Sequence, residues 1–333
     1  MNENLFHASI DGRPSGAERP LLARVSIATF AWVMGLGGLA NSFLAAHVAL
    51  GVPIIVSQAL LLPAAVCFVL LLAVHAAKTG LHFDAVLDEF RHPVRSAFFP
   101  AMSVAAIVIS IGLRSYSEPT ARLLWCVGAA VHLILAVTLI RRWILHAQDE
   151  RVMTPAWFIP VVGNILIPVG GVPLGFVQVG WFFFSIGLVL WIVFFTLALH
   201  RILFLAAMSD RSIPTLFILL APPSIGLAAY FAFSGGSVGP LADILYSLAL
   251  FIAILLATLI REITHGPFFM SWWAMTFPLD GWAGASALYF RARPSMLTET
   301  VAVVALAAAS CMLAWVVVRT TAYVISGKAF RED

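Results

Sequence analysis

The chain has 333 residues, of which 62% are hydrophobic and only 11% are charged, and its mean hydropathy is +1.00. A soluble globule of this length needs a more polar surface, so the composition excludes that class and indicates an integral membrane protein. The formal net charge is +3. Because no soluble basic face carries this charge, we expect no nucleic-acid partner, and membrane lipid is the expected surrounding.

Apolar stretches long enough to cross a bilayer, which takes about 20 residues in a helix, recur along the whole chain. In chain order they cover about 25–46, 53–77, 96–113, 120–145, 156–173, 175–206, 214–234, 240–261, 267–290 and 295–318. These stretches are continuously apolar, which favours helices over the alternating strands of a barrel. We therefore expect an all-α fold with ten transmembrane helices in one domain, 24–320, between cytoplasmic tails at 1–23 and 321–333.

The distribution of Lys and Arg predicts the orientation, because cytoplasmic loops retain positive charge. With both termini in the cytoplasm, only four of the 19 Lys and Arg residues fall outside: Arg114, Arg122, Arg291 and Arg293. The first span is too long for the core of a signal peptide, so we expect no cleaved signal. The sequence thus predicts a multi-pass protein of the inner (plasma) membrane with cytoplasmic N- and C-termini.

Prolines mark the starts of the predicted spans. Proline is tolerated in the first turn of a helix because its missing N–H would be unpaired there in any case. Ten of the 18 prolines precede or open a span: Pro20, Pro93, Pro155, Pro214 and Pro267 before odd-numbered spans, and Pro53, Pro119, Pro173, Pro240 and Pro294 before even-numbered ones. From Pro93 onward the odd-span prolines are 62, 59 and 53 residues apart. This repeat predicts five parallel helical hairpins in a quasi-fivefold ring.

The prolines inside the spans predict which helix of each hairpin faces the axis of the ring. Six of the seven interrupt odd-numbered spans: Pro100, Pro160, Pro168, Pro222, Pro223 and Pro278; only Pro63 breaks an even one. Span one contains Gly35, Gly37 and Gly38 instead. Because broken backbone is tolerated at membrane depth when it is buried in protein or lines a watery cavity, we expect kinked odd helices to line a central pore. The alternative is that the kinks serve packing alone.

Four segments resemble one transporter family. The ninth span reads Trp-Trp-Ala-Met-Thr-Phe-Pro over 272–278, and the entry to the third span reads His-Pro-Val-Arg-Ser-Ala-Phe-Phe over 92–99. Pro-Ala-Trp-Phe-Ile-Pro at 155–160 and Leu-Ala-Pro at 220–222 add to these. The segments resemble the TehA and plant slow-type anion channel family, which includes tellurite-resistance and dicarboxylate transporters within the voltage-dependent anion channel superfamily.

The resemblance implies ten helices in five hairpins, kinked inner helices around a pore in each subunit, and a homotrimer. It also implies that a phenylalanine of the ninth helix plugs the pore, a role that falls on Phe277. The chain departs from the family at Gly35, where relatives often have a proline nearby, and at Asp280, where relatives have a neutral residue. Asp280 could titrate and couple transport to protons, stabilise a broken helix while protonated, or lie near the outer interface.

Besides Phe277 as the gate, ten residues are candidates to line the pore. They are Gly35, Gly38, Pro100, Ser103, Pro160, Asn164, Pro222, Thr276, Pro278 and Asp280. Polar groups such as Ser103 and Asn164 could instead join helices by hydrogen bonds. His132 lies inside an even span and is expected to be a packed or hydrogen-bonded side chain. Neither the cysteines nor the histidines have the spacing of a metal site, so no metal and no cofactor are expected.

The function predicted from these observations is a transmembrane channel or transporter for small anions, gated by Phe277. Its partners would be small inorganic or organic anions, and the N-terminal ends of half-helices could attract them. The alternative is a proton-coupled transporter of C4-dicarboxylates, sulfite or tellurite-type oxyanions that uses Asp280. A membrane-embedded enzyme ranks lower, because Asp280 has no catalytic partner at its depth, and no enzyme activity is expected. A structural or sensory subunit also ranks below transport.

Overall fold

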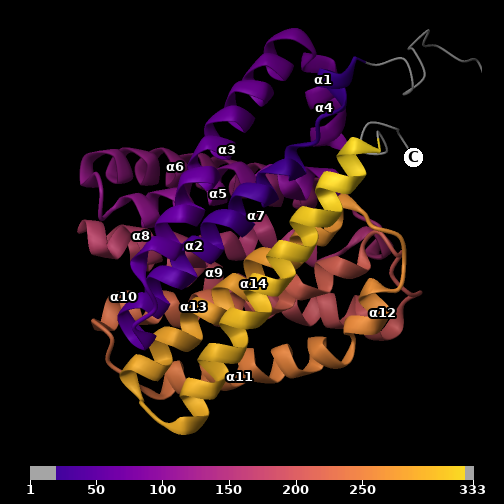
Figure 1. Cartoon of the computed structure of the whole chain (residues 1–333). Helices are drawn as coiled ribbons and strands as arrows, with labels where there is room; N and C mark the ends of the chain where they lie inside the picture. The colour runs from indigo at the N-terminus through magenta and orange to yellow at the C-terminus, as the bar shows by residue number, and fades with distance from the viewer. Residues whose placement is uncertain (1–19, 327–333) are drawn as a thin grey trace, which may run out of the picture.

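The computed structural model describes residues 20–326, and every regular element within this range is a helix (Figure 1). The predicted tails at 1–23 and 321–333 lie mostly outside the described residues. Nine helical segments in this range are long and apolar enough to cross a membrane: Ile27–Leu50, Ile54–Leu81, Arg95–Leu113, Glu118–Leu145, Pro155–Leu174, Val177–Phe204, Ile213–Ser234, Pro240–Thr258 and Met296–Ile325. The fold is therefore that of a helical membrane protein, as the hydropathy predicted.

The stretch predicted as the ninth of ten spans forms η9 (Met270–Met275) and α13 (Thr276–Ala292). It is not among the nine apolar segments, because its three tryptophans, Pro278 and Asp280 lower its hydropathy. Most residues of α13 are nevertheless buried, and the segment packs between α2, α10 and α14. Its burial in protein, and not in lipid, accounts for the weaker hydropathy.

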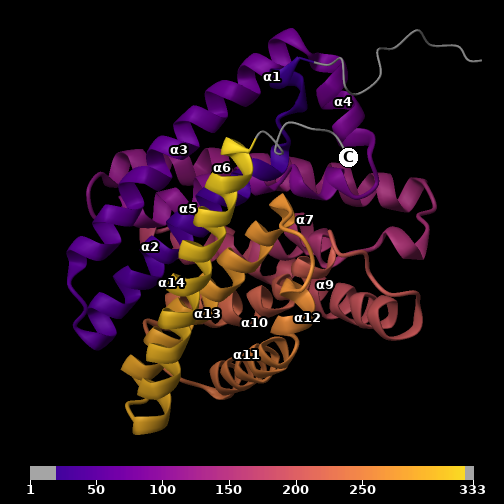
Figure 2. The same ribbon diagram turned by 45° about the vertical axis from the view of Figure 1, so that its right-hand side comes forward.

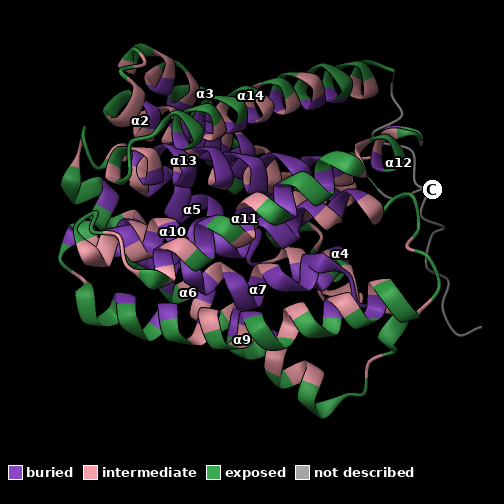
Figure 3. Ribbon diagram, turned by 90° about the horizontal axis from the view of Figure 1, so that it is seen from below, coloured by how far each residue is buried: buried purple, intermediate pink, exposed green. Residues whose placement is uncertain are grey.

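The five outer helices are continuous. They are α3 (Ile54–Leu81), α6 (Glu118–Leu145), α9 (Val177–Phe204), α11 (Pro240–Thr258) and α14 (Met296–Ile325). Between 28% and 39% of the residues in their most apolar stretches are buried. Pro63 lies inside α3 without ending it. Figure 3 shows that these helices turn exposed faces outward, as expected for helices that face lipid.

The inner segments each begin as a 3₁₀ helix and continue as an α-helix. They are η2 (Ile27–Thr29) with α2 (Phe30–Leu50), η3 (Arg95–Phe98) with α5 (Ala101–Leu113), η8 (Ile213–Leu220) with α10 (Ala221–Ser234), and η9 with α13. The segment between Pro155 and Leu174 changes repeatedly, through η5 (Pro155–Trp157), α7 (Phe158–Val162), η6 (Gly163–Leu166), α8 (Ile167–Gly171) and η7 (Val172–Leu174). Between 50% and 72% of the residues in the four apolar inner segments are buried. The interior prolines thus accompany broken helices, as predicted from their loss of a backbone donor.

The contacts between elements define the arrangement. Each inner segment packs against the outer helix that follows it in the chain. The inner segments also pack against one another in a closed circuit: α2 with α5, α5 with α8, α8 with α10, α10 with α13, and α13 with α2. In Figure 3 the buried elements α5, α10 and α13 lie inside this arrangement. Early residues of all five inner segments line one cavity and their later residues line another, so these segments start toward one end and finish toward the other.

Two turns at the second end depend on glycine. Gly51 (φ 72°) follows α2 and Gly235 (φ 62°) follows α10, and both are left-handed caps that a side chain would strain. Pro53 and Pro240 then open α3 and α11. This glycine-then-proline order ends one helix and starts the next within a few residues.

The opposite end carries α1 (Leu21–Arg24) and α4 (Phe83–Arg91), which lie together beside the end of α3 (Figures 1 and 2). A buried ion pair joins α3 to α4, with Lys78 Nζ 2.8 Å from Glu89 Oε2, and Lys78 also donates to the backbone carbonyl of Val25, directly after α1. Glu89 also accepts hydrogen bonds from Ser26 Oγ and from the backbone N–H of Ile27. The pair thereby anchors the chain just before α2, although hydropathy predicted that the second span ends at about 77.

The second inner segment, which is the third predicted span, begins at the His92–Phe99 motif. The Nδ1 atom of His92 accepts hydrogen bonds from the backbone N–H groups of Val94 and Arg95, each at 3.1 Å. Partial burial, followed by the positive charge of Arg95, lowers the pKa of His92, which Glu89 partly offsets. The neutral imidazole therefore holds the turn that starts η3.

Candidate functional site

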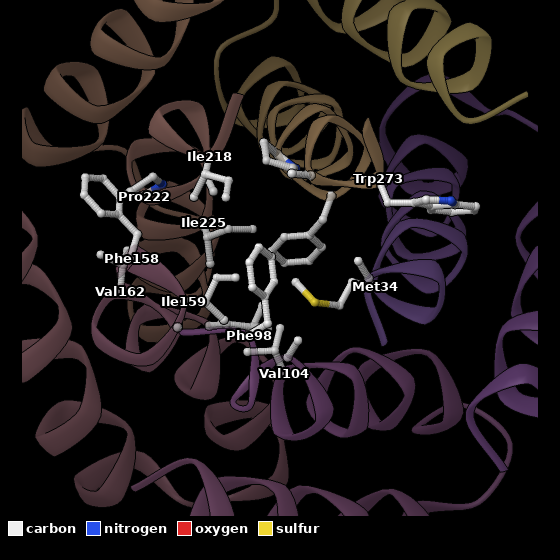
Figure 4. A pocket seen from close by; sticks show the side chains of 18 residues that line it. Met34, Phe98, Val104, Phe158, Ile159, Val162, Ile218, Pro222, Ile225 and Trp273 are labelled. Atoms are coloured by element: carbon white, nitrogen blue, oxygen red, sulfur yellow. The ribbon is translucent and has the colours of Figure 1, made fainter. Parts of the chain in front are cut away.

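A small apolar cavity of about 70 Å³ lies inside the circuit of inner segments. It is lined from all five: by Ala31 and Met34; Phe98, Ala101 and Val104; Phe158, Ile159, Val162, Gly163 and Leu166; Ile218, Ala221, Pro222 and Ile225; and Trp273, Ala274, Phe277 and Pro278. Figure 4 shows the labelled side chains converging from different helices, with Phe98 reaching toward the middle. The inner cavity has room for only a few water molecules and offers them no charged group.

A second, larger cavity of about 520 Å³, called here the vestibule, lies toward the C-terminal ends of the inner segments. Its lining includes the later residues of each segment, such as Val48, Ile111, Val169, Ala232 and Leu288. Three charged residues line it: Arg114, Asp280 and Arg291. The vestibule is therefore wider and more polar than the inner cavity.

Three residues line both cavities: Leu166, Ile225 and Phe277. They come from η6, α10 and α13, so three different inner segments contribute to this narrow region, called here the neck. Phe277 has the largest side chain of the three. The neck is an apolar closure between two cavities, a geometry that can block ions both by steric exclusion and by dewetting.

The backbone around Phe277 is held by its neighbours. Thr276 is fully buried, and its hydroxyl donates to the carbonyl oxygen of Trp273 at 2.9 Å. The indole N–H of Trp273 donates to Thr320 Oγ1 of α14 at 2.8 Å. Gly38 of α2 allows the Phe277 ring to approach this helix, since a methyl group at Gly38 would lie 3.1 Å from Phe277 Cδ2. The neck ring is thus packed directly against α2.

Asp280 lies one turn after Phe277 and is fully buried. Neither carboxyl oxygen has a hydrogen-bond partner among the described residues. Its side chain packs against Gly38, where a methyl group would lie 2.7 Å from Asp280 Oδ2. Ser42 Oγ donates instead to the backbone carbonyl of Asp280, at 2.5 Å. The carboxyl group therefore lies within the wall between α2 and α13, beside the vestibule.

The four arginines assigned to the outside differ in their partners. Arg122 pairs with Glu118 at 2.7 Å, and Arg293 pairs with Asp243 at 3.1 Å. Arg114 and Arg291 are the two that line the vestibule, and neither has an ion pair within residues 20–326. Their charge is therefore available to attract an anion into the vestibule.

The model of one protein family matches residues 24–321 of the chain, and its description is voltage-dependent anion channel. The chain belongs to the voltage-dependent anion channel family. This match confirms the resemblance inferred from the four motifs.

Relatives in two groups of organisms are similar to this family member. The S-type anion channel SLAH3 of Arabidopsis thaliana is 27% identical over 92% of the chain and 49% of its own length. The guard cell S-type anion channel SLAC1 of the same plant is 25% identical over 87% of the chain and 54% of its length. The tellurite resistance protein TehA homolog of Haemophilus influenzae is 22% identical over 83% of both chains. The chain thus spans about half the length of these plant relatives.

Five of the predicted site residues line a cavity of this family member. Gly38 and Asp280 line the vestibule, Pro222 and Pro278 line the inner cavity, and Phe277 lines both. They come from α2, α10 and α13, which pack together on one side of the circuit. The structure therefore brings together the residues around the ninth predicted span.

The other six candidates line neither cavity, and most take part in packing between helices. A methyl group at Gly35 would lie 2.4 Å from Thr276 Oγ1, so these two form a close contact of α2 with α13. Ser103 donates to the carbonyl of Pro100 and lies 2.9 Å from His132 Nδ1. Asn164 donates to the carbonyls of Pro160 and Val161. These polar groups satisfy broken backbone within the inner segments.

Several lining residues were not singled out from the sequence. Leu166 and Ile225 complete the neck, and Phe98 adds a further aromatic ring to the inner cavity. Phe98 lies within the His92–Phe99 motif, which is the one sequence signal that could have indicated it. Among the described residues, no three His, Cys, Asp or Glu side chains form a group that could hold a metal ion.

The junctions between 3₁₀ and α-helix offer few free backbone donors. The N–H groups of Phe99, Ala221 and Thr276, at the starts of the α-helical parts, already bond to carbonyls within the preceding turns. The positive end of each helix dipole therefore does not provide unpaired donors at the inner cavity. Among the described residues, the positively charged side chains that line a cavity are Arg114 and Arg291 of the vestibule.

Proposed function

We propose that the protein is a passive channel for small anions, which pass along the axis of the inner segments when Phe277 leaves the neck. The observation that carries this proposal is that Phe277 lines both cavities, one on each side of it. Removing the Phe277 ring from the neck would join the two cavities into one path. Phe277 is thus the proposed gate.

In this proposal η9 and α13 form a tenth transmembrane segment and complete five parallel hairpins. The closed circuit of contacts and the burial of α13 support this arrangement. Both termini then lie in the cytoplasm, where most Lys and Arg residues are placed, and the vestibule opens to the outside.

The preference for anions is supported by the vestibule and by the names of the relatives. Arg114 and Arg291 supply positive charge that no acidic partner among the described residues neutralises, while the inner cavity supplies no charge of either sign. An apolar inner path favours weakly hydrated monovalent anions over dicarboxylates, because each additional charge must be dehydrated without compensation. We therefore propose chloride or nitrate as the better substrates.

The proposal is tested by anion flux into proteoliposomes that contain the purified protein. Phe277→Ala is expected to raise chloride and nitrate flux by roughly tenfold or more, because it removes an apolar closure of the path. Phe251→Ala is the matched control, since Phe251 is 63% exposed on α11 and lines neither cavity. This control is expected to leave flux unchanged.

Both variants must be compared at equal amounts of reconstituted, monodisperse protein. Equal flux in wild type and in Phe277→Ala would contradict the role of Phe277 as the gate. Flux of potassium as large as that of chloride through Phe277→Ala would contradict the preference for anions.

A further inference from the structure

The carboxyl group of Asp280 is the buried charge that the proposed gate does not explain. Its side chain is fully buried, and neither carboxyl oxygen has a hydrogen-bond partner within residues 20–326. An ionised group in such a place is costly and marks a functional site by default. Asp280 is also one helical turn from Phe277, on the vestibule side of the neck.

We propose that Asp280 is a proton-binding switch that makes anion passage depend on the pH of the vestibule. Anions pass the neck when Asp280 carries a proton and is neutral, and its ionised form repels them. This inference rests on the proposed anion conduction through the neck. The inference adds the proton as a second ligand, and it specifies that this proton comes from the side of the membrane to which the vestibule opens.

The position of Asp280 makes its charge effective. A methyl group at Gly38 would lie 2.7 Å from Asp280 Oδ2 and 3.1 Å from Phe277 Cδ2, so the carboxylate and the Phe277 ring approach each other on the same side of α2. Side chains three residues apart on a helix are neighbours, with Cβ atoms about 5–6 Å apart. Across a partly dry wall, such a charge lowers the occupancy of the neck by an anion roughly 10- to 100-fold. Because the oxygens are packed against Gly38, Asp280 acts through its field and not as a direct ligand.

No other charge near α13 takes over this role. On α11, Asp243 is held by Arg293 and by Tyr289, and Tyr246 stacks on Tyr289. Two further titratable groups are His47 of α2, which bonds to the carbonyl of Val52, and Tyr230 of α10, which lies beside Gly239. The titratable groups of α14 are Glu299, Cys311, Arg319 and Tyr323. Of these, Arg319 and Tyr323 pack against the ring of Phe268. None of these groups bonds to Asp280, which leaves Arg114 and Arg291 as the other charged residues that line the vestibule.

A proton fits this site better than a metal cation does. A cation would need several oxygen ligands around the carboxylate. The described residues place no cluster of His, Cys, Asp or Glu here, and the nearby Ser42 hydroxyl already donates to backbone carbonyls. A single proton neutralises the carboxyl without further ligands.

The experiment uses single channels of Phe277→Ala in a planar bilayer, so that the gate does not mask the effect, with pH changed on one side at a time. Raising the pH of one side from about 5 to about 9 is expected to lower the chloride current roughly tenfold or more. The same change on the other side is expected to have a smaller effect, because protons from that side must first cross the inner cavity and the neck before they reach Asp280 beside the vestibule. The double variant Phe277→Ala/Asp280→Asn is expected to keep the high current at every pH.

Asp243→Asn in the Phe277→Ala background is the matched control, because it removes a carboxylate that lines neither cavity. It is expected to retain the pH dependence of the Phe277→Ala channel. The inference is overturned if Asp280→Asn retains that dependence, or if both sides act equally. A Phe277→Ala channel that conducts chloride with no pH dependence would overturn this inference alone. A Phe277→Ala protein that conducts no anion at any pH would overturn the proposed function itself.

Discussion

Replacing Arg114 and Arg291 by glutamine tests the source of the preference for anions. Both side chains line the vestibule and lack an ion-pair partner within the described residues. Their loss should leave the fold intact, because neither side chain is buried. It should lower the concentration of anions at the mouth of the neck.

The size of the effect follows from the dimensions of the vestibule. A sphere of the vestibule's volume, about 520 Å³, has a radius of about 5 Å. An anion at its centre would then lie about 8 Å from a guanidinium group on the wall. At this distance each positive charge contributes roughly 0.5–1 kcal/mol when the dielectric constant is close to that of water. The pair together would raise anion occupancy roughly five- to thirtyfold at low salt.

The assay is the chloride conductance of single Phe277→Ala channels with and without Arg114→Gln and Arg291→Gln, at low and at high salt. We expect a severalfold lower conductance in about 0.01 M salt and a much smaller difference in about 1 M salt, where the Debye length falls to about 3 Å. Arg122→Gln is the control, because Arg122 pairs with Glu118 and does not line the vestibule.

The reasoning is refuted if the double glutamine variant conducts as well as its parent at low salt. It is also refuted if the difference persists at high salt, because the arginines would then act through structure and not through their field. An equal loss in Arg122→Gln would indicate a nonspecific effect of surface charge.

Two predictions concern stability, read as the melting temperature of the purified protein in detergent. Gly38→Ala should destabilise the fold by roughly 1–3 kcal/mol, because its methyl group would meet the Asp280 carboxyl and the Phe277 ring. Gly80→Ala is the control and should not destabilise the fold, because Gly80 has open space around it. Equal melting temperatures for the two variants would contradict the close packing at Gly38. Glu89→Gln should cost roughly 3–5 kcal/mol, because it leaves Lys78 charged and buried without its partner. Replacing both residues by apolar ones of similar volume should recover part of that loss, and a Glu89→Gln protein as stable as wild type would show that the pair does not anchor α4.

The class of the protein and the boundaries of most helices could be predicted from its sequence. Apolar length and the position of proline are local properties, so the starts at Pro53, Pro119 and Pro240 needed no tertiary information. The concentration of interior prolines on odd spans also indicated which segments are broken. These inferences rest on backbone chemistry that holds in any surroundings.

Which side chains face the cavities could not be predicted in the same way. The inner segments change from 3₁₀ to α-helix, so the rotation about the helix axis from one residue to the next changes within each segment. A projection that assumes one helix type therefore assigns some side chains to the wrong face. Asn164 and Thr276 therefore looked like pore residues, but both bond to carbonyls of their own segments. The neck residues Leu166 and Ile225 carry no sequence signal that separates them from other apolar residues.

Pairing of charges is likewise a tertiary property. The count of Lys and Arg placed Arg114, Arg122, Arg291 and Arg293 outside without distinguishing among them. The pair of Arg122 with Glu118 is local, four residues apart on α6, but only the three-dimensional contacts reveal that Arg293 pairs with Asp243 and that the other two line the vestibule. The partner of Lys78 was hidden for the same reason, because Glu89 belongs to a separate helix.

The reversal potential of Phe277→Ala channels tests the central claim most directly. The current is measured across a planar bilayer with a tenfold gradient of potassium chloride. If removal of the ring opens an anion path, the channels conduct and the current reverses near the chloride equilibrium potential, about 59 mV from zero. A reversal near the potassium potential, of opposite sign, or a conductance no larger than that of wild type would contradict the claim that Phe277 closes a path for anions.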